Sequence, residues 1–593
     1  MADIAQTPAK PFRLGLTMAG AISAGAYTAG VFDFLIEALQ AWEAEKAKQR
    51  ASGLPREQWD VPDHDVIISA MSGASAGGMT SALGLLALAG GAKRSDFTCG
   101  TQTIQGVLDT LYTAWVIKPR MLPDNGKAGL LGTDDIEASK GAGAISALNG
   151  KVLTDIVDGA IANYRYGGST FPFIADDLNL FLTTTNLRGV PYKVPFTNSQ
   201  NQTSYYEMSS HADIAHFKVK GVGRAVFSSP WLANLPQPAA FPIDMQTIGT
   251  DGTWAHYSNT ALATGAFPIG LPARLIQGVK RGDYDNRRWP LEKAAAISGL
   301  TTAFTLPTAF PPPARPDADA RYVAVDGGVI NNEPFELTRW TLMANPPFDN
   351  PGDEKHCDTA QILIDPFPED ANYNPIYEPD LTLRSIAGAV IGALKSQVRF
   401  KADELLDALS GTLYSRYMIS PSRTDPKTMR RYRETIACGL LGGFGGFAEE
   451  AFRQHDYQLG RINCRTFLTR YFSVPAGNDI IAAGYGPLLN LPPNDQRIAR
   501  FTTQGVNGPE YQIIPVLLPR SQHLPWPKIT EAQAERIVRA SVNRAGAVLK
   551  NLKIEGLPSV AISIAWHLLG KSKVENAIRE KLLDDLADRE QID

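Results

Sequence analysis

The chain has few cysteines for its length, which limits the chemistry that sulfur can supply. Cys99, Cys357, Cys438 and Cys464 are the four in 593 residues, and no two of them stand at CxxC spacing. Thiols this sparse indicate neither a disulfide framework nor a zinc site. A reducing compartment suits such a composition, and we predict a cytoplasmic protein.

Long apolar runs and export signals are missing as well. The N-terminus as far as Pro11 holds no apolar segment of signal-peptide length. No run reaches the roughly 18 apolar residues of a spanning helix, and the nearest, residues 560–569, is interrupted by Ser563 and His567. We therefore predict neither a signal peptide nor a transmembrane segment. Peripheral contact with a membrane surface stays open, with residues 560–569 and the helix after them as a hypothetical anchor.

Neither sign of charge dominates the sequence. The 57 basic and 61 acidic residues leave a net charge of −4, and Lys and Arg form no extended run. Nucleic-acid binding is therefore not expected. HExxH, EF-hand and Cys/His ligand patterns are also absent, so the sequence implies no metal or organic cofactor.

The N-terminal part alternates strand-like and helix-like apolar segments. Helices are predicted from Gly30 and at residues 79–89. Strands are predicted at residues 12–17, 65–71, 178–184, 322–325, 361–364 and 511–518. Such alternation favours an α/β fold, a three-layer α/β/α sandwich around a mainly parallel sheet. Residues 188–254 are rich in Ser, Asn, Gln and Pro, and we expect loops over the core there.

Helical patterns take over after about residue 368. They include residues 381–409 and a segment opened by Thr530 and Gln533 at capping-box spacing. One face of a last, packed helix carries Val574, Ile578, Leu582 and Leu586. Residues 437–447, ACGLLGGFGGF, are interpreted as a flexible segment and not as a dinucleotide fingerprint. We predict a domain over residues 12–370 and a largely helical extension over residues 371–593.

Gly73, Ser75 and Gly77 form a GxSxG sequence between a predicted strand and a predicted helix. A serine at a strained strand-to-helix turn needs almost no side chain beside it to project its hydroxyl. A plain turn of small residues has the same composition, but the flanking strand and helix favour a nucleophile elbow. A serine hydroxyl becomes a good nucleophile only when a base takes its proton.

Asp326 is the best candidate for that base. It ends an apolar strand and is followed by Gly327 and Gly328, which let another backbone approach the carboxylate closely. The alternative is an Asp-Gly hairpin turn of type I′.

A loop of small residues, MAGAISAG at residues 18–25, follows the first predicted strand. Backbone N–H groups in such a loop can point at a developing oxyanion, and a flexible strand-to-helix connection is the plainer alternative. It is not a phosphate-binding P-loop, because Ala26 and Tyr27 follow its GxxxxG spacing where Lys and Ser or Thr would stand.

Together these three elements resemble the patatin-like phospholipase family. That family has a glycine-rich loop, then GxSxG, then an Asp-Gly-Gly box, and this chain has LTMAGAISAGAYTAGV, SGASAGG and VDGGVINNEP in the same order. FLTTTNLRG and ALATGAFPIGLP look like two further segments of the family, so the similarity spans about residues 12–370.

The resemblance implies a lipid acyl hydrolase with a Ser–Asp dyad and without a histidine base. Ser75 would attack the carbonyl of a lipid or other acyl ester, and Asp326 would take up and return the proton. The oxyanion would be held by N–H groups of Gly20, Ala21, Ile22 and Ala76. The family loop usually carries three glycines and then an arginine, whereas this chain keeps Gly20 alone. Alignment on Tyr27 puts Ala24 in the arginine position, and alignment on Leu16 shifts the match and needs two inserted residues. Phospholipase and general esterase activity therefore stay open as alternatives.

Two other functions are compatible with the sequence. One is an α/β-hydrolase with a Ser–Asp–His triad, in which His356 follows Ser75 in a suitable order, although no HGGG-type loop is present. The histidines His211, His216 and His256 lie in polar stretches and are expected at the surface or the core edge. The other function is that of a catalytically idle relative that binds lipid or a partner, motivated by the altered loop.

Overall fold

The computed structural model describes residues 10–138, 143–229, 240–280, 318–343, 353–368, 416–425, 427–428, 430–552 and 570–593. The helix predicted at residues 381–409 and the hypothetical anchor at residues 560–569 lie outside the described residues.

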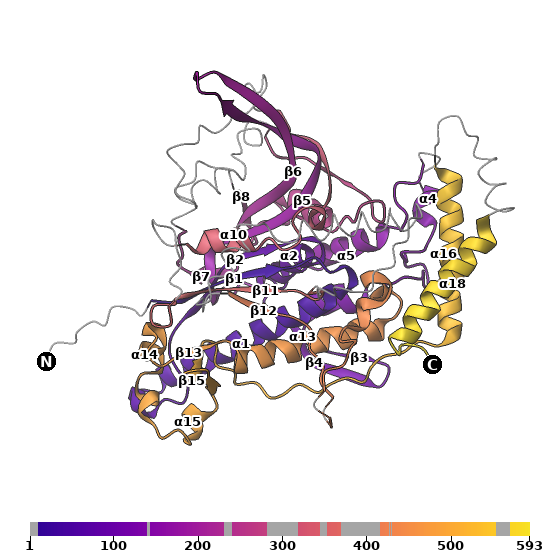
Figure 1. Cartoon of the computed structure of the whole chain (residues 1–593). Coiled ribbons are helices and arrows are strands. Elements are labelled where there is room, and N and C mark those ends of the chain that lie inside the picture. The colour runs from indigo at the N-terminus through magenta and orange to yellow at the C-terminus, as the bar shows by residue number, and fades with distance from the viewer. Residues whose placement is uncertain are drawn as a thin grey trace.

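A ten-stranded sheet forms the centre of the molecule, with the main path β12-β11-β1-β2-β5-β10-β9 (Figure 1). In that order the strands span Arg416–Ile419, Thr359–Ile364, Phe12–Met18, Val66–Gly73, Phe171–Thr197, Tyr322–Asp326 and Arg274–Ile276. Neighbours from β12 to β5 run parallel, whereas β10 is antiparallel to both β5 and β9. The predicted α/β fold with a mainly parallel central sheet is confirmed.

Helices cover both faces of the sheet, as β1 shows. Its Thr17 hydroxyl lies 3.1 Å from that of Thr338 in α10 (Phe335–Leu342). Its next residue, Met18, lies on the opposite face and accepts a hydrogen bond from Ser81 of α2 (Ser75–Ala89). The long helix α1 (Gly25–Ala51) lies on the α2 side, away from α10 (Figure 1). Strands covered on both faces are mostly apolar, and β2 is buried along its whole length.

Shorter elements complete the N-terminal part. They are the hairpin β3 (Arg94–Cys99) and β4 (Gln102–Leu108), and the helices η1 (Ile22–Ala24), η2 (Arg56–Gln58), α3 (Asp109–Tyr112), η3 (Thr113–Ile117), α4 (Asp134–Ala138), α5 (Lys151–Ala162), α7 (Thr253–Thr264) and η4 (Gly327–Val329).

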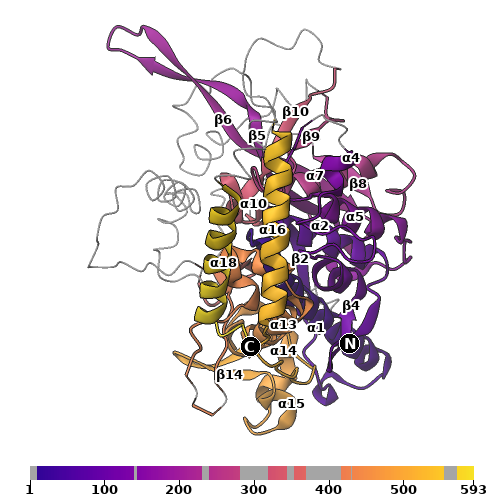
Figure 2. The same ribbon diagram turned by 90° about the vertical axis from the view of Figure 1, so that its right-hand side faces the viewer.

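The loops expected over residues 188–254 are the main error of the sequence-based prediction. β5 and β6 (Thr203–Lys220) form a long antiparallel hairpin that projects from the body (Figures 1 and 2). β7 (Gly223–Ala225) and β8 (Phe241–Asp244) also join the sheet. Cross-strand backbone pairing holds strands whose faces are open to solvent, so a polar composition does not exclude them. The strand expected at residues 511–518 is wrong in extent, because β15 ends at Gln512.

The C-terminal region is mainly helical. Its helices are η5 (Ala437–Gly443), η6 (Gly445–Phe447), α13 (Glu450–Arg470), α14 (Asp479–Tyr485), η7 (Gly486–Asn490), α15 (Gln496–Ala499), α16 (Glu531–Asn551) and α18 (Lys571–Asp588). A small sheet consists of β13 (Ser473–Pro475), β14 (Thr502–Gly505) and β15 (Gly508–Gln512). The capping box of Thr530 and Gln533 is present, and Leu582 and Leu586 are buried, as predicted. α16 and α18 lie side by side (Figure 2).

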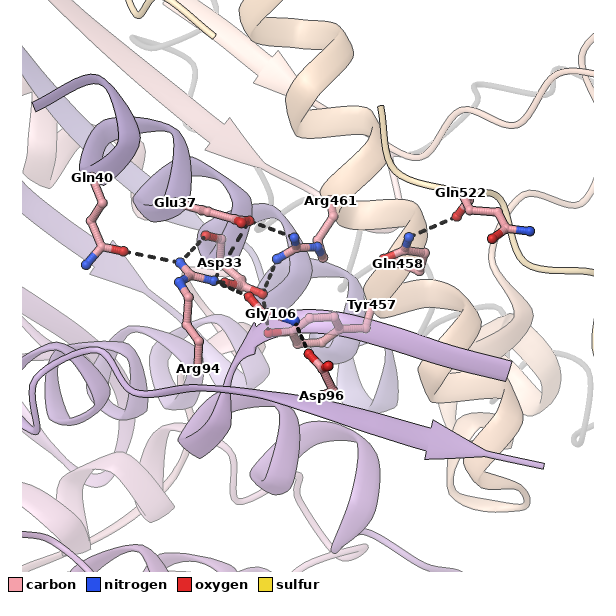
Figure 3. A network of polar contacts seen from close by, with 10 residues as sticks. All are labelled: Asp33, Glu37, Gln40, Arg94, Asp96, Gly106, Tyr457, Gln458, Arg461 and Gln522. Atoms are coloured by element: carbon pink, nitrogen blue, oxygen red, sulfur yellow. Dashed lines mark hydrogen bonds and ion pairs between the residues drawn. The ribbon is translucent and has the colours of Figure 1, made fainter. Parts of the chain in front are cut away.

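Buried charges join this region to the N-terminal part (Figure 3). Asp33 of α1 is fully buried and accepts hydrogen bonds from Arg94, from Tyr457 and from Arg461 of α13. Arg461 also bonds Glu37, at 2.6 Å. β12, which follows residue 370, extends the central sheet. A division into two domains at residue 370 stays a prediction.

Among the described residues, one helix, Ile22–Ala51, is long and apolar enough to cross a membrane by length and composition. Of its most apolar window, 89% is buried inside the fold. A buried core helix meets the same criteria of length and composition, so the helix carries little weight as evidence for a membrane span.

Candidate active site

Ser75 lies at the turn between β2 and α2. β2 ends at Gly73, the helix begins at Ser75, and Ser75 has φ +50°, in the left-handed region. Such a backbone costs about 1–3 kcal/mol for a non-glycine residue and persists only where the surroundings enforce it. The GASAG sequence thus forms the sharp strand-to-helix turn expected of a nucleophile elbow.

Contacts with two other segments hold this turn. The Ala74 N–H donates to the Met18 carbonyl at 3.2 Å, and the Ser75 N–H donates to the Thr264 hydroxyl at 3.0 Å. Gly77 lies so close to the end of β1 that a Cβ there would overlap the Met18 carbonyl oxygen. The second glycine of the motif is therefore a packing requirement between α2 and β1.

Asp326 accepts the hydroxyl hydrogen of Ser75. The Ser75 Oγ to Asp326 Oδ2 distance is 2.7 Å, between side chains 251 positions apart in the chain. The other carboxylate oxygen, Oδ1, accepts the Gly328 N–H at 2.7 Å. The backbone of Asp326 is held as well, since its N–H donates to Ala266 and its carbonyl accepts from Thr185. The Asp-Gly-Gly box is therefore not a hairpin turn, because β10 continues into η4.

The carboxyl group of Asp326 is buried, with 4% of the residue exposed. Burial raises its pKa from 3.8 to about 6, and the hydrogen bonds from Ser75 and Gly328 counteract part of that rise. A base whose pKa lies just below neutral pH is charged at neutral pH and still binds a proton well. Gly327, next to it, packs against Thr183 of β5 with no room for a Cβ.

The loop after β1 lies against the serine. A Cβ on Gly20 would come within 2.9 Å of the Ser75 Cβ. The Gly20 N–H donates to the Asn332 carbonyl at 3.3 Å, so it is already engaged. Within the described part of the chain, the N–H groups of Ala21, Ile22 and Ala76 donate to no protein acceptor. These three N–H groups are therefore the candidate donors for a ligand oxygen, and Ile22 has an unusual φ of +49°.

No imidazole approaches the pair among the described residues. His356 is exposed and contacts Asp353, and His64 is buried with its ring nitrogen 2.7 Å from the Ile513 carbonyl. His211 is exposed, and His216 and His256 are half-buried, as expected. Over the same residues, no group of three or more His, Cys, Asp and Glu side chains could hold a metal ion.

Three residues near the site were not singled out from the sequence. Thr264 receives the Ser75 N–H, Asn332 receives the Gly20 N–H, and Ser23 bonds the C-terminal segment 437–447. Thr264 and Asn332 lie inside segments that resemble the patatin-like family, but no spacing rule marks them individually. Their roles depend on contacts between distant segments.

Comparison with known proteins identifies a relative that is similar over almost the whole chain. No family model matches the chain. A match to the crystal structure of VipD from Legionella pneumophila covers 99% of this chain and 91% of that chain, at 12% identity and a TM-score of 0.21. The uncharacterized protein y4iI of Sinorhizobium fredii is 38% identical over 610 residues, covering 98% of this chain and 82% of that protein. The chain belongs to the same family as this rhizobial protein.

Proposed function

We propose that the chain is a serine acyl hydrolase that cleaves carboxylic esters of lipids through a Ser75–Asp326 dyad. The observation that carries the proposal is the 2.7 Å hydrogen bond from the hydroxyl of a serine with φ +50° to a buried carboxylate. The resemblance to patatin-like phospholipases supports the same pair of residues.

The reaction takes place in two halves. Asp326 takes the hydroxyl proton while Ser75 Oγ attacks the ester carbonyl, and the resulting oxyanion is held by the N–H groups of Ala21, Ile22 and Ala76. Collapse of the tetrahedral intermediate releases the alcohol, which leaves with the proton from Asp326. Water, deprotonated by Asp326, then attacks the acyl-Ser75 ester, and Asp326 returns the proton to Ser75 Oγ as the carboxylic acid is released.

Apolar side chains on segments that adjoin the dyad support an acyl substrate. The carbonyl of Ala266 accepts the Asp326 N–H, and Phe267 is the next residue in the chain. The ring centroid of Phe267 lies 5.6 Å from that of Phe444. A Cβ on Gly443 would touch both Ile22 and Phe367 at 3.4 Å. An apolar surround favours an acyl chain over a polar alcohol, because transfer of hydrocarbon out of water is favourable.

The test compares wild type, Ser75→Ala and Asp326→Asn on a short-chain p-nitrophenyl ester and on a labelled phospholipid. We expect each substitution to lower kcat by about 10⁴-fold or more, with the circular dichroism spectrum unchanged. The ratio of the two wild-type rates separates a phospholipase from a general esterase. A wild-type protein inactive on both substrates would instead favour the idle, lipid- or partner-binding relative. Activity in Asp326→Asn would overturn the dyad.

We also infer a peripheral contact with the lipid surface, made by apolar side chains near the site. Ile269 is 86% exposed and Phe267 41% exposed, and Ile145, at 72%, lies near the point where Ala147 bonds the Ile269 carbonyl. Flotation with phosphatidylcholine vesicles should be weakened by Ile269→Asp. Val506→Asp, in the fully exposed turn between β14 and β15, is the matched control. Equal flotation of both variants would contradict the contact.

A further inference from the structure

The apolar-glycine segment of the C-terminal region lies directly against the loop beside Ser75. We call residues 437–447 the glycine bracket; they form η5 and η6. Both helices contact η1, the helix that begins at Ile22 in the loop after β1. The sequence assigns no role to the bracket, and none of its side chains takes part in the bond-making steps of the proposed reaction.

Ser23 makes the connection. Its hydroxyl is fully buried, donates to the Gly443 carbonyl and accepts the Gly446 N–H at 3.1 Å. The two partners lie 420 and 423 positions further along the chain. A Cβ on Gly446 would overlap the Ser23 hydroxyl and come within 2.5 Å of Cys438 Sγ. Glycine at position 446 is therefore what allows the bracket to reach the loop.

The residue before Ser23 has a strained backbone. Ile22 adopts φ +49°, which is a genuine outlier for a β-branched side chain. A conformation of this kind costs on the order of 1–3 kcal/mol and needs surroundings that enforce it. The hydrogen bonds of Ser23 with the bracket are the polar contacts that hold this backbone, and Gly443 packs beside the Ile22 side chain.

The bracket is itself fixed by buried groups of the C-terminal helices. Asp456 of α13 accepts the N–H groups of Ala437 and Cys438 at 2.9 and 2.8 Å. Arg453 of α13 donates to the Gly446 carbonyl, and Asp585 of α18 accepts the Leu441 N–H at 2.6 Å. Asp456 is fully buried and Arg453 is 3% exposed. The bracket is thus pinned at its start, middle and end, and is not the flexible segment that its composition suggests.

We propose that Ser23 and the glycine bracket are positioning elements that hold the Ala21 and Ile22 N–H groups toward the oxyanion formed at Ser75. The inference rests on the proposed function and extends it, because it makes the helical C-terminal region part of the catalytic apparatus. Positioning acts on the transition state, where the negative charge develops, and much less on the bound ester.

The experiment uses the full chain and three variants. Ser23→Ala removes the hydrogen bonds of the Ser23 hydroxyl with Gly443 and Gly446. Gly446→Ala places a Cβ against that hydroxyl and so disrupts the same contacts. Ser69→Ala is the control. Ser69 is a fully buried serine in β2, and within the part of the chain that the structure describes its hydroxyl bonds only the Ile67 carbonyl, at 3.4 Å. The measurements are kcat and KM on p-nitrophenyl butyrate, and the inhibition constant of an alkyl trifluoromethyl ketone, which forms a tetrahedral adduct with the serine.

We expect Ser23→Ala and Gly446→Ala to lower kcat by about 10- to 10³-fold and to leave KM within about twofold. Affinity for the ketone should fall by a similar factor, since the adduct resembles the transition state. Ser69→Ala should match wild type in all three values. A merely structural role would lower the melting temperature without this parallel loss.

Two results overturn the proposal and differ from each other. If wild type hydrolyses the ester and both Ser23→Ala and Gly446→Ala keep its kcat, positioning by the bracket is wrong while the proposed function stands. If wild type hydrolyses no ester, the proposed function fails first. Should both variants unfold, Asp585→Asn, which acts on Leu441 in the middle of the bracket, provides the decisive kcat, and an unchanged value contradicts the proposal.

Discussion

Ser75 and Ile22 have nearly the same unusual backbone angle, with φ +50° and +49°, yet the two turns are stabilised from different parts of the chain. The Ser75 turn is held by Met18 and Thr264, both within the region of family resemblance. The Ile22 turn is held through Ser23 by the glycine bracket, more than 400 positions away. The turn that carries Ser75 is therefore built by the N-terminal part, whereas the loop beside it also contacts the C-terminal region.

Gly77→Ala should have the largest effect, because it breaks the Ser75 turn from within. A Cβ there overlaps the Met18 carbonyl oxygen, so the start of α2 has to move away from β1. We expect kcat/KM on a p-nitrophenyl ester to fall by about 10³-fold or more and stability to fall by about 1–3 kcal/mol. Gly159→Ala, in α5 with no atom near its Cβ position, is the control and should stabilise slightly. Full activity in Gly77→Ala would contradict the packing argument.

Asp456→Asn should have a smaller effect, because it acts on the Ile22 turn and leaves the contacts of the Ser75 turn in place. The amide has one acceptor oxygen, so one of the N–H groups of Ala437 and Cys438 loses its partner. We expect kcat to fall by about 10- to 100-fold with KM nearly unchanged, and stability to fall by about 1–3 kcal/mol. Steady-state kinetics and chemical denaturation measure the two effects. A change in KM alone would show that the bracket shapes substrate binding instead.

The pH profile sharpens the assignment of the base. Since burial raises the pKa of Asp326 to about 6, its carboxylate is charged above that pH and protonated below it. We expect log(kcat/KM) to be flat above about pH 7 and to fall with a slope approaching one per pH unit well below pH 6. An acid limb near pH 4 would indicate a base with an ordinary carboxyl pKa, and would count against Asp326.

The stability of Asp326→Asn tests the same pKa without catalysis. Because folding raises the pKa of this carboxyl, its charged form destabilises the folded state. The destabilisation is absent below about pH 3.8, where the group is protonated in both states, and complete above about pH 6. That destabilisation is on the order of 3 kcal/mol. Asp326→Asn should therefore melt above wild type at pH 8, and the difference should shrink toward zero near pH 4. Equal melting temperatures at pH 8 would contradict the raised pKa.

Much of the central sheet follows from local patterns in the sequence. Residues 12–17 and 65–71 are short segments rich in apolar residues, and they form β1 and β2, which are buried almost throughout, as expected of parallel strands covered on both faces. The hairpin of β5 and β6 could not be read in this way. Its backbone pairing is independent of side-chain polarity, so residues 188–254 looked like loops.

The residues of the candidate dyad were also accessible from the sequence. GASAG and the Asp-Gly-Gly box carry their own steric logic, since small neighbours are needed at a tight turn and beside a close backbone. The residues that hold these motifs carry no such mark. Thr264, Asn332 and Ser23 are ordinary polar residues until the fold brings their partners to them.

The sequence by itself therefore determined the strongly apolar elements and the short turns with special steric needs. Its resemblance to the patatin-like family also singled out Ser75 and Asp326 as a candidate pair. These properties depend on neighbours along the chain. Only the tertiary structure decided the 2.7 Å approach of two side chains 251 positions apart, the raised pKa of Asp326 and the contact between Ser23 and the glycine bracket. Each of these depends on burial and on long-range packing, which a linear pattern does not encode.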